Sequence, residues 1–347
     1  MPNGTTPAPR ERGWIRVILA LAALLLIPHI PGGPSTLPVV DTLVLLVPAL
    51  AACCVVGWWA GGSLWLALIW STLAAAILVL PPPAGVDDAY YALARGWGVI
   101  VAAAFGVVCL VGRGQPFITR ALMGLGLAIV LSLGVIGVGR LDPGSAERVF
   151  AGQFAARNSA AVDEMEKDAS QVAESFPNLS GMAREVATRQ AQVQDTLSQY
   201  AAPIYPAALA LEALAALALA WALFHRLSRV RIGAPLAPLK LFTFGDQLVW
   251  ALVAGVALIL VPSRDALAAI GTSVLIFFGT LYALRGYGIY AWFISRRVAV
   301  TSVAVAVAAF PLSLVTVPWA VGLGVSDTWI DWRRRLKHSL TGGSDRA

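Results

Sequence analysis

Residues 203–225, with the sequence PIYPAALALEALAALALAWALFH, form an apolar run whose one Asp, Glu, Lys or Arg residue is Glu212. An α-helix rises about 1.5 Å per residue, so a helix of this length crosses the roughly 30 Å hydrocarbon core of a bilayer. Alanine and leucine, which dominate the run, are strong helix formers. The run therefore predicts a transmembrane helix, with Glu212 about 14 Å into it and close to the midplane.

The composition of the whole chain extends this interpretation beyond one helix. Of the 347 residues, 58% are hydrophobic and 13% are charged, whereas an average soluble domain has about 25% charged residues. These values exclude an ordinary soluble enzyme, and they exclude a disordered chain, which needs low hydrophobicity and high charge. The net charge of +6 does not indicate a nucleic-acid partner, because basic residues in a membrane protein mostly mark its cytoplasmic loops. The expected partner is the lipid bilayer.

Further apolar runs flank this helix on both sides. They cover residues 17–30, 37–60, 62–80, 96–112 and 121–139 before it, and residues 247–263, 266–294 and 298–326 after it. Pro311 and Pro318 interrupt the last run, so its full crossing is in question. We predict an all-α, polytopic transmembrane bundle of eight or nine spans. Five of them fall in residues 14–139, one in 203–226 and the others in 246–326.

Residues 140–202 differ in kind, because they hold nine of the nineteen acidic residues of the chain. Apolar residues recur there at spacings of three and four, which is typical of amphipathic helices, and Pro177-Asn178 breaks the pattern. The segment predicts a helical hairpin, with Asn178 capping its second helix. The narrow, alanine-rich apolar stripes fit either pairing of the two helices with each other or a position on the membrane surface.

Basic residues give the chain an orientation. The loop of residues 227–245 contains Arg229, Arg231 and Lys240 and no acid, and loops of this kind stay in the cytoplasm. Residues 1–13 are expected to be disordered and cytoplasmic. The first apolar run lacks a small-residue cleavage site, which indicates an uncleaved helix. Five crossings separate this N-terminus from the hairpin, which is therefore expected outside the cytoplasm.

If all nine apolar runs cross the membrane, the tail of residues 327–347 lies outside the cytoplasm. If one run does not cross, with 298–321 as the candidate, the tail lies inside. Asp327 and Asp331 are four residues apart, so they share a face of a helix. One interpretation is an interfacial helix with tryptophans among the headgroups and arginines on phosphates. The other is a docking element for a protein partner, formed by Asp327, Trp329, Asp331 and Arg333.

Signatures of catalysis and of metal binding are missing from the sequence. It contains no HExxH, GxSxG, GxGxxG or P-loop pattern. The cysteines Cys53, Cys54 and Cys109 lie within apolar runs, and the three histidines are far apart, so neither a zinc site nor a disulfide framework is predicted. We therefore expect no enzyme activity, no metal and no cofactor.

Glu212 and Arg285 are the candidates for lining a binding cavity in the membrane. A carboxylate deep in a span is costly, so it usually faces a bundle interior or a wet cavity and marks function. Glu212 also fits a hydrogen bond to a neighbouring helix or a place near the outer interface. Arg285 fits a pair with an acid on another helix, but snorkelling toward the inner headgroups is the preferred interpretation. Asp246, at the start of a helix, is expected to cap it.

Three motifs carry a resemblance to a known family. They are Gly324-Val-Ser-Asp-Thr-Trp-Ile-Asp-Trp-Arg333, Leu281-Tyr-Ala-Leu-Arg-Gly-Tyr-Gly288 and Pro235-Leu-Ala-Pro-Leu-Lys-Leu-Phe-Thr-Phe-Gly-Asp246. In these motifs the chain resembles the YybS-like bacterial membrane proteins, a family of unknown function, although Arg285 stands where that family usually has Gln. The resemblance implies a place in the bacterial cytoplasmic membrane. Such proteins are distantly similar to the substrate-binding subunits of energy-coupling-factor vitamin transporters, which implies a six-helix core at residues 14–226 and an added three-helix unit at 246–326.

The leading functional hypothesis is binding or transport of a small molecule, with Glu212 and Arg285 lining the cavity. The alternative is a non-catalytic membrane scaffold that binds an envelope partner through the 140–202 hairpin. Transport requires polar groups that converge on a cavity in the membrane. The scaffold requires an exposed apolar face on the hairpin.

Overall fold

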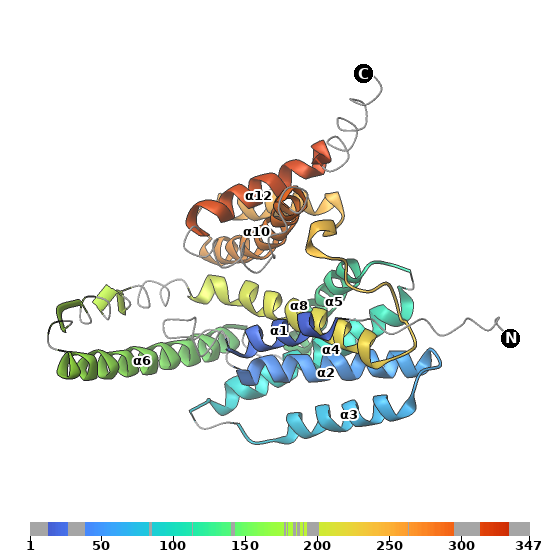
Figure 1. The fold of residues 1–347 in the computed structure, drawn as a ribbon, viewed down its shortest axis with the longest axis horizontal. Coiled ribbons are helices and arrows are strands. Elements are labelled where there is room, and N and C mark those ends of the chain that lie inside the picture. Colours follow the sequence, from blue (N-terminus) through green and yellow to red (C-terminus); the bar gives the residue numbers. More distant parts are fainter. Residues whose placement is uncertain are drawn as a thin grey trace, which may run out of the picture. The chain divides into compact units, whose positions relative to one another are not determined.

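Helices make up the regular structure of the described chain. The computed structural model describes residues 13–26, 39–82, 85–112, 114–139, 143–176, 178, 180–182, 185, 188–189, 191–192, 201–262, 264–294 and 313–332. Within these ranges every regular element is a helix (Figure 1), which confirms the expected all-α class. The chain divides into two compact units, Met1–Leu236 and Ala237–Ala347.

The first unit is a bundle built around helix α2. Its helices are α1 (Trp14–Leu26), α2 (Val39–Trp59), α3 (Leu64–Val79), α4 (Asp88–Val111), α5 (Phe117–Gly139), α6 (Pro143–Ser175) and α8 (Ala201–Leu227). Helix α2 packs against α3, α4 and α8, and α4 also packs against α5. Leu50, Phe105, Trp221 and Phe224 are among the largest fully buried side chains. The core therefore lies where α2, α4 and α8 meet.

Local signals set the ends of the central helices. After α2, Gly61 has φ +93°, a left-handed conformation that glycine adopts without strain, and the Gly62 N–H donates to the Gly57 carbonyl across 2.9 Å. Before α4, the Asp87 carboxylate accepts a hydrogen bond from the Tyr90 N–H at 2.8 Å, which is the contact of an N-cap. These local contacts set the end of α2 and the start of α4.

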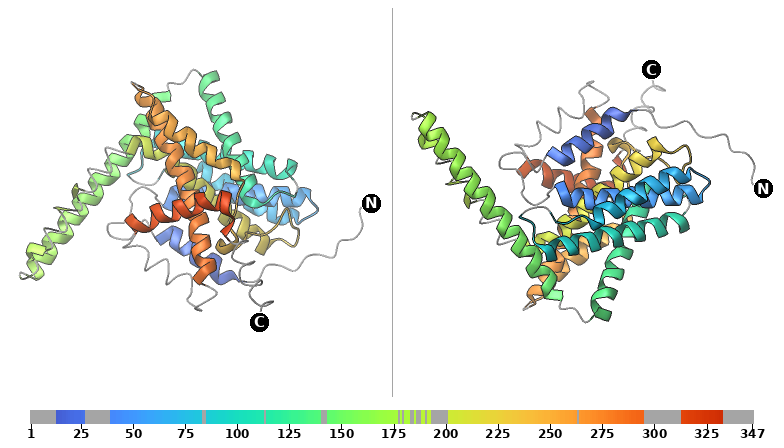
Figure 2. Two further views of the ribbon diagram at one scale, coloured as in Figure 1. Left: turned by 90° about the horizontal axis from the view of Figure 1, so that it is seen from above. Right: turned by 90° about the horizontal axis from the view of Figure 1, so that it is seen from below.

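The first half of helix α6 is fixed to the bundle. The Gln153 side chain accepts from the Asp87 N–H at 3.0 Å and donates to the Gly85 carbonyl at 3.3 Å. The Phe150 ring stacks on Tyr205 of α8, with 4.2 Å between centroids. Beyond this anchored part, α6 extends away from the other helices of the first unit (Figure 2).

Helix α6 corresponds to the first helix of the predicted hairpin. It ends at Ser175, just before the predicted break. Asn178 lies in a 3₁₀ turn, and residues 180–182 and 191–192 are helical. The side of the membrane on which this segment lies stays a prediction.

The second unit is centred on helix α10. Its elements are η3 (Leu239–Leu241), η4 (Asp246–Leu248), α9 (Val249–Ile259), α10 (Asp265–Ile294) and α12 (Ser313–Ile330). Helix α10 packs against both α9 and α12. A Cβ on Gly286 would overlap the Ala320 carbonyl, and a Cβ on Gly324 would overlap the Tyr282 carbonyl. Glycine at these two positions therefore lets the backbones of α10 and α12 touch.

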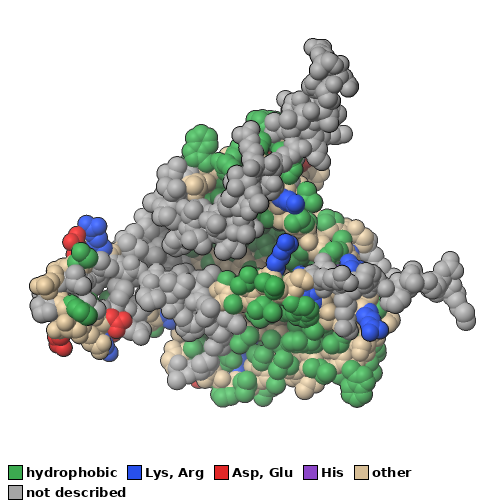
Figure 3. Space-filling model, viewed as in Figure 1, with side chains coloured by type: hydrophobic (Ala, Val, Ile, Leu, Met, Phe, Trp, Pro, Cys, Tyr) green, Lys and Arg blue, Asp and Glu red, His purple; other side chains and the backbone are tan. Residues whose placement is uncertain are grey.

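Five helices of the described chain are long and apolar enough to cross a membrane. They are Thr42–Trp59, Asp88–Val111, Phe117–Gly139, Ile204–Leu227 and Asp265–Phe293, and three shorter apolar helices are Trp14–Ala23, Leu64–Val79 and Asp246–Ile259. Hydrophobic side chains cover much of the face of the first unit that Figure 3 shows, and Trp65 on α3 is 74% exposed. A membrane protein with several spans is thus supported, whereas the count of eight or nine stays a prediction. Residues 298–312 of the last expected run lie outside the described residues.

Candidate functional site

Glu212 lies inside the first unit and is bonded to helix α2. The Thr42 hydroxyl donates a hydrogen bond to Glu212 Oε1 across 3.1 Å, and both side chains are buried. Thr42 belongs to the first turn of α2, where the helix dipole places a partial positive charge that stabilises a carboxylate. Glu212 is therefore level with the first turn of α2, and its depth in the membrane stays a prediction. The contact with a neighbouring helix is one of the alternatives considered for Glu212, and its role in binding stays a prediction.

Arg285 of α10 is held by two carboxylates in the second unit. Its Nε donates to Asp327 Oδ2 on α12, and its Nη1 donates to Asp246 Oδ1 on η4, both at 2.9 Å. The Arg285 side chain is 6% exposed and that of Asp327 is 3% exposed, whereas that of Asp246 is 61% exposed. The pairing interpretation of Arg285 therefore holds, and the preferred snorkelling interpretation is wrong, because two acids lie within reach of the guanidinium.

These ion pairs also correct two expectations for the acids. Asp246 does not cap its helix: the N-cap position is Gly245, and the Asp246 carboxylate is turned to Arg285. Asp327 is buried, and its second oxygen accepts from the Trp332 N–H at 3.1 Å, so it is not available to dock a partner. Trp329 and Asp331 are exposed.

Arg333, the fourth residue of the expected docking element, lies outside the described residues.

The cluster around Arg285 joins the three sequence motifs that carry the family resemblance. Phe244 comes from the motif Pro235–Asp246, and its ring centroid lies 5.5 Å from the Arg285 guanidinium carbon. Tyr282 comes from the second motif and packs edge-on against Phe244, with 4.9 Å between centroids. Asp327 comes from the motif Gly324–Arg333 and accepts from the Arg285 Nε. The motifs thus supply one buried polar cluster within the second unit.

A second polar arrangement, which sequence reasoning missed, closes one end of the first unit. Three buried side chains bind three consecutive carbonyls of the loop after α8. Arg120 Nη1 donates to Ile232 O at 2.7 Å, His225 Nε2 lies 3.0 Å from Gly233 O, and Trp221 Nε1 donates to Ala234 O at 3.0 Å. We call Arg120, Trp221 and His225 the carbonyl clamp. The only signal in the sequence was an arginine and a histidine placed at the ends of apolar runs.

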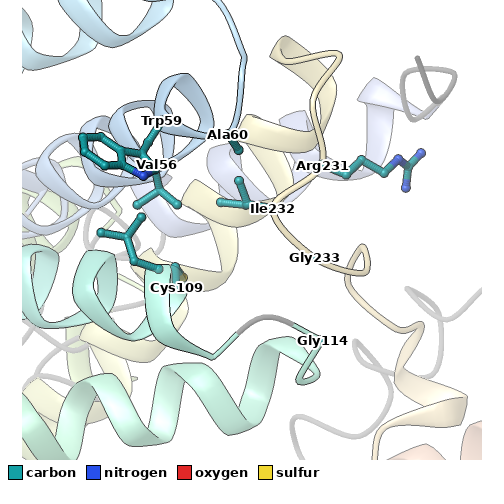
Figure 4. Close-up of a pocket in the computed structure, with 9 residues that line it drawn as sticks. Val56, Trp59, Ala60, Cys109, Gly114, Arg231, Ile232 and Gly233 are labelled. Carbon is teal, nitrogen blue, oxygen red and sulfur yellow. The ribbon is translucent and has the colours of Figure 1, made fainter. Parts of the chain in front are cut away.

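A half-enclosed hollow of about 320 Å³ lies beside the carbonyl clamp. It is lined by Val56, Trp59, Ala60, Cys109, Leu110, Gly114, Arg231, Ile232 and Gly233. Figure 4 shows Val56, Ile232 and Cys109 grouped together, whereas the Arg231 guanidinium extends away from them. Neither Glu212 nor Arg285 is among the lining residues.

These features define a class, a helical membrane protein with several spans and buried polar clusters in each of two units. A family model described as "Predicted membrane protein (DUF2232)" matches residues 149–328, which is more than half of the chain. The chain belongs to this family of membrane proteins. The match runs from α6 to the residue after Asp327, so it includes the whole Arg285 cluster.

No curated protein and no solved structure matches the chain. The likeness to YybS-like proteins and to transporter subunits therefore rests on the sequence motifs alone and stays a prediction.

Proposed function

We propose that this protein is a non-enzymatic component of the bacterial cytoplasmic membrane that binds a small molecule in the hollow of its first unit. The observation that carries the proposal is the hollow itself. Its volume of about 320 Å³ falls within the range of roughly 300–1,000 Å³ that is typical of small-molecule sites. Binding would be the first step of transport, as the resemblance to transporter subunits implies.

The lining of the hollow supports binding of a partly apolar molecule. Val56, Trp59, Leu110 and Ile232 present apolar surface, and the backbone of Gly233 adds polar atoms. Small-molecule sites typically combine apolar walls with a few polar groups that orient the ligand.

The carbonyl clamp supports a wall that is in place before a ligand arrives. It holds the backbone of Ile232, Gly233 and Ala234 through side chains of α5 and α8. A wall that is ordered in advance lowers the entropy cost of binding. The hollow opens at the end of the bundle where the basic loop 227–245 begins, and we propose that this end faces the cytoplasm, on the same side as the N-terminus.

Glu212 has a different role in this proposal. Its partner Thr42 is 17 residues before Trp59 on α2, which is about 25 Å along the helix. Glu212 therefore fastens α8 to α2 at the end far from the hollow. The proposed binding site thus lies at the opposite end of α2 from Glu212.

The test is native mass spectrometry of the full-length protein purified in mild detergent. We expect a bound small molecule that copurifies with the wild type and is lost in Ala60→Trp, because the indole fills the hollow. The matched control is Val79→Trp, which adds the same side chain at a position that is 82% exposed. Equal retention in wild type and Ala60→Trp would show that the hollow is not the binding site.

A second candidate function, a scaffold for an envelope partner, is supported by helix α6 and the residues that follow it. Phe176 is 61% exposed and Met182 is 66% exposed, and both follow the anchored half of α6 in the chain. Exposed apolar side chains on a water-facing helix often mark a protein interface.

Photo-crosslinking in intact membranes separates this candidate from the first. A crosslinking amino acid at Phe176 should give one discrete protein adduct, and the same group at the exposed Gln171 should give none. Adducts with lipid alone at Phe176 would rule out the scaffold and leave the binding proposal untouched.

A further inference from the structure

Arg120 is completely buried in the first unit, and most of its hydrogen-bonding capacity is unused. It lies in the first turn of α5. Its Nη1 donates to Ile232 O, whereas Nε and Nη2 have no hydrogen-bond partner within the described ranges. The Trp221 ring centroid lies 5.3 Å from the guanidinium carbon. A guanidinium keeps its charge at all physiological pH values, and the Ile232 carbonyl, the Trp221 ring and the Cys109 thiol give it no negatively charged partner within the described residues.

Among the described residues, no acid forms an ion pair with Arg120. Residues 226–245 contain no Asp or Glu. Arg226 at the end of α8 and Arg229 and Arg231 in the loop add further positive charge. Buried charges in proteins are normally paired, because desolvation of an unpaired ion is unfavourable. Within the described part of the chain, this environment therefore lacks an anion.

The guanidinium of Arg120 lies directly behind the wall of the hollow. Three lining residues adjoin it: the Ile232 carbonyl accepts from it, a Cβ on Gly233 would lie 2.6 Å from its Nη1, and the Cys109 thiol lies beside it. The N-terminus of α5 begins at the same place, since Gly114 lines the hollow three residues before the helix starts. Helix N-termini favour anions through their free N–H groups and their dipole.

We infer that the hollow takes an amphiphile whose acidic head, a phosphate or a carboxylate, balances Arg120, while its apolar part lies on Val56, Trp59 and Leu110. This inference rests on the proposed function and names the ligand class for it. The side chain of Arg231 extends away from the other lining side chains (Figure 4), so Arg120 is the charge that is fixed at the wall. A lipid headgroup and a free phosphate ion both offer the required chemistry.

The experiment compares two lipids that differ in head-group charge. Full-length protein in detergent is incubated with equal amounts of phosphatidylglycerol and phosphatidylcholine that have identical acyl chains, and retained lipid is counted by native mass spectrometry. We expect about tenfold preference for phosphatidylglycerol, because the buried charge of Arg120 attracts the anionic head group through the wall at low effective dielectric. Arg120→Gln should bring the ratio close to one. The control, Arg229→Gln, removes an exposed arginine outside the hollow and should keep the preference.

Inorganic phosphate at millimolar concentration identifies the source of the anion. If phosphate displaces phosphatidylglycerol, the site recognises the anionic group alone. If phosphatidylglycerol stays bound, the site requires both the head group and the acyl chains. A wild type that retains both lipids equally overturns the inference, and this result needs no variant to be folded. If Ala60→Trp nevertheless releases both lipids, the proposed function stands without the anion preference. If Ala60→Trp releases neither, the proposed function fails as well.

Thermal unfolding keeps the result for Arg120→Gln interpretable. If that variant does not fold, Arg120→Lys keeps a cation in the same place and should keep the preference for phosphatidylglycerol. If folded Arg120→Lys and Arg229→Gln both lose the preference for phosphatidylglycerol, the inference is wrong. The exposed basic residues, and not Arg120, would then cause the selectivity.

Discussion

The two units each contain one buried arginine, and the two arginines differ in their hydrogen-bond and ion-pair partners. Arg285 is 6% exposed and is held by Asp246 and Asp327, both at 2.9 Å. Arg120 is 0% exposed and contacts one carbonyl, one aromatic face and one thiol, with no carboxylate bonded to it among the described residues. At similar burial, the arginine of the second unit has carboxylate partners, whereas the arginine of the first unit has none among the described residues.

This difference separates a structural role from a binding role. A buried guanidinium with its acids in place is a finished ion pair that holds helices together. A buried guanidinium without an acid is stable only if something else supplies the negative charge. Both arginines are buried, so burial alone does not distinguish a structural role from a binding role. The partners of each guanidinium distinguish the two roles.

The largest expected effect comes from Arg285→Met. This change leaves Asp327 buried without its cation, and breaking a buried pair in this way costs about 3–5 kcal/mol. Denaturant unfolding in detergent should show a loss of free energy of this size, with hydrogen exchange rising in α10 and α12. The control is Arg264→Met, an exposed arginine, which should change stability by less than about 0.5 kcal/mol. Equal effects of the two changes would mean that the Arg285 cluster is not a structural ion pair.

The next effect concerns Arg120 and depends on an added anion. Phosphatidylglycerol at about 100 times its dissociation constant should stabilise the wild type by about 2.7 kcal/mol, because the lipid binds the folded state. Arg120→Gln should lose about half of this gain, because tenfold weaker binding leaves about 1.4 kcal/mol at the same lipid concentration, whereas Arg264→Met should keep it. If phosphatidylglycerol stabilises Arg120→Gln as much as the wild type, Arg120 does not contribute to lipid binding.

A smaller effect is expected for Thr42→Val. The change keeps the shape of the side chain but removes the hydroxyl that donates to buried Glu212. Loss of one hydrogen bond to a buried carboxylate costs about 1–3 kcal/mol. Thr272→Val is the control, because the Thr272 hydroxyl bonds the Ala268 carbonyl within its own helix and should matter less. Thermal unfolding in detergent with both variants measures the difference.

The helices could be predicted from the sequence because their signals are local. The run 37–60 became α2, Val39–Trp59, and the run 203–225 became α8, Ala201–Leu227. Apolar length and turn residues are properties of neighbouring positions, so they need no knowledge of the fold. The break before Asn178 is likewise reflected in the end of α6 at Ser175.

The partners of the buried polar residues could not be predicted, because they are distant in the chain. Arg285 is the one basic residue of α10, which signals a need for an acid, but Asp246 and Asp327 are 39 and 42 residues away. Arg120 gave a misleading signal, since an arginine at the end of a span usually snorkels to the headgroups. Its burial follows from the loop after α8 folding back over it, and no local pattern encodes that contact.

The smallest effect is expected for Asp246→Asn, and it tests whether the Arg285 cluster has a hierarchy. Asp246 is 61% exposed, so water screens its pair with Arg285, and exposed pairs contribute about 0–1 kcal/mol. Asp327→Asn, at 3% exposure, should cost several times more in the same unfolding measurement. A loss for Asp246→Asn that approaches the loss for Asp327→Asn would mean that Arg285 needs both carboxylates. The two acids would then contribute equally to stability, and the exposure of an acid would not predict its contribution to a buried ion pair.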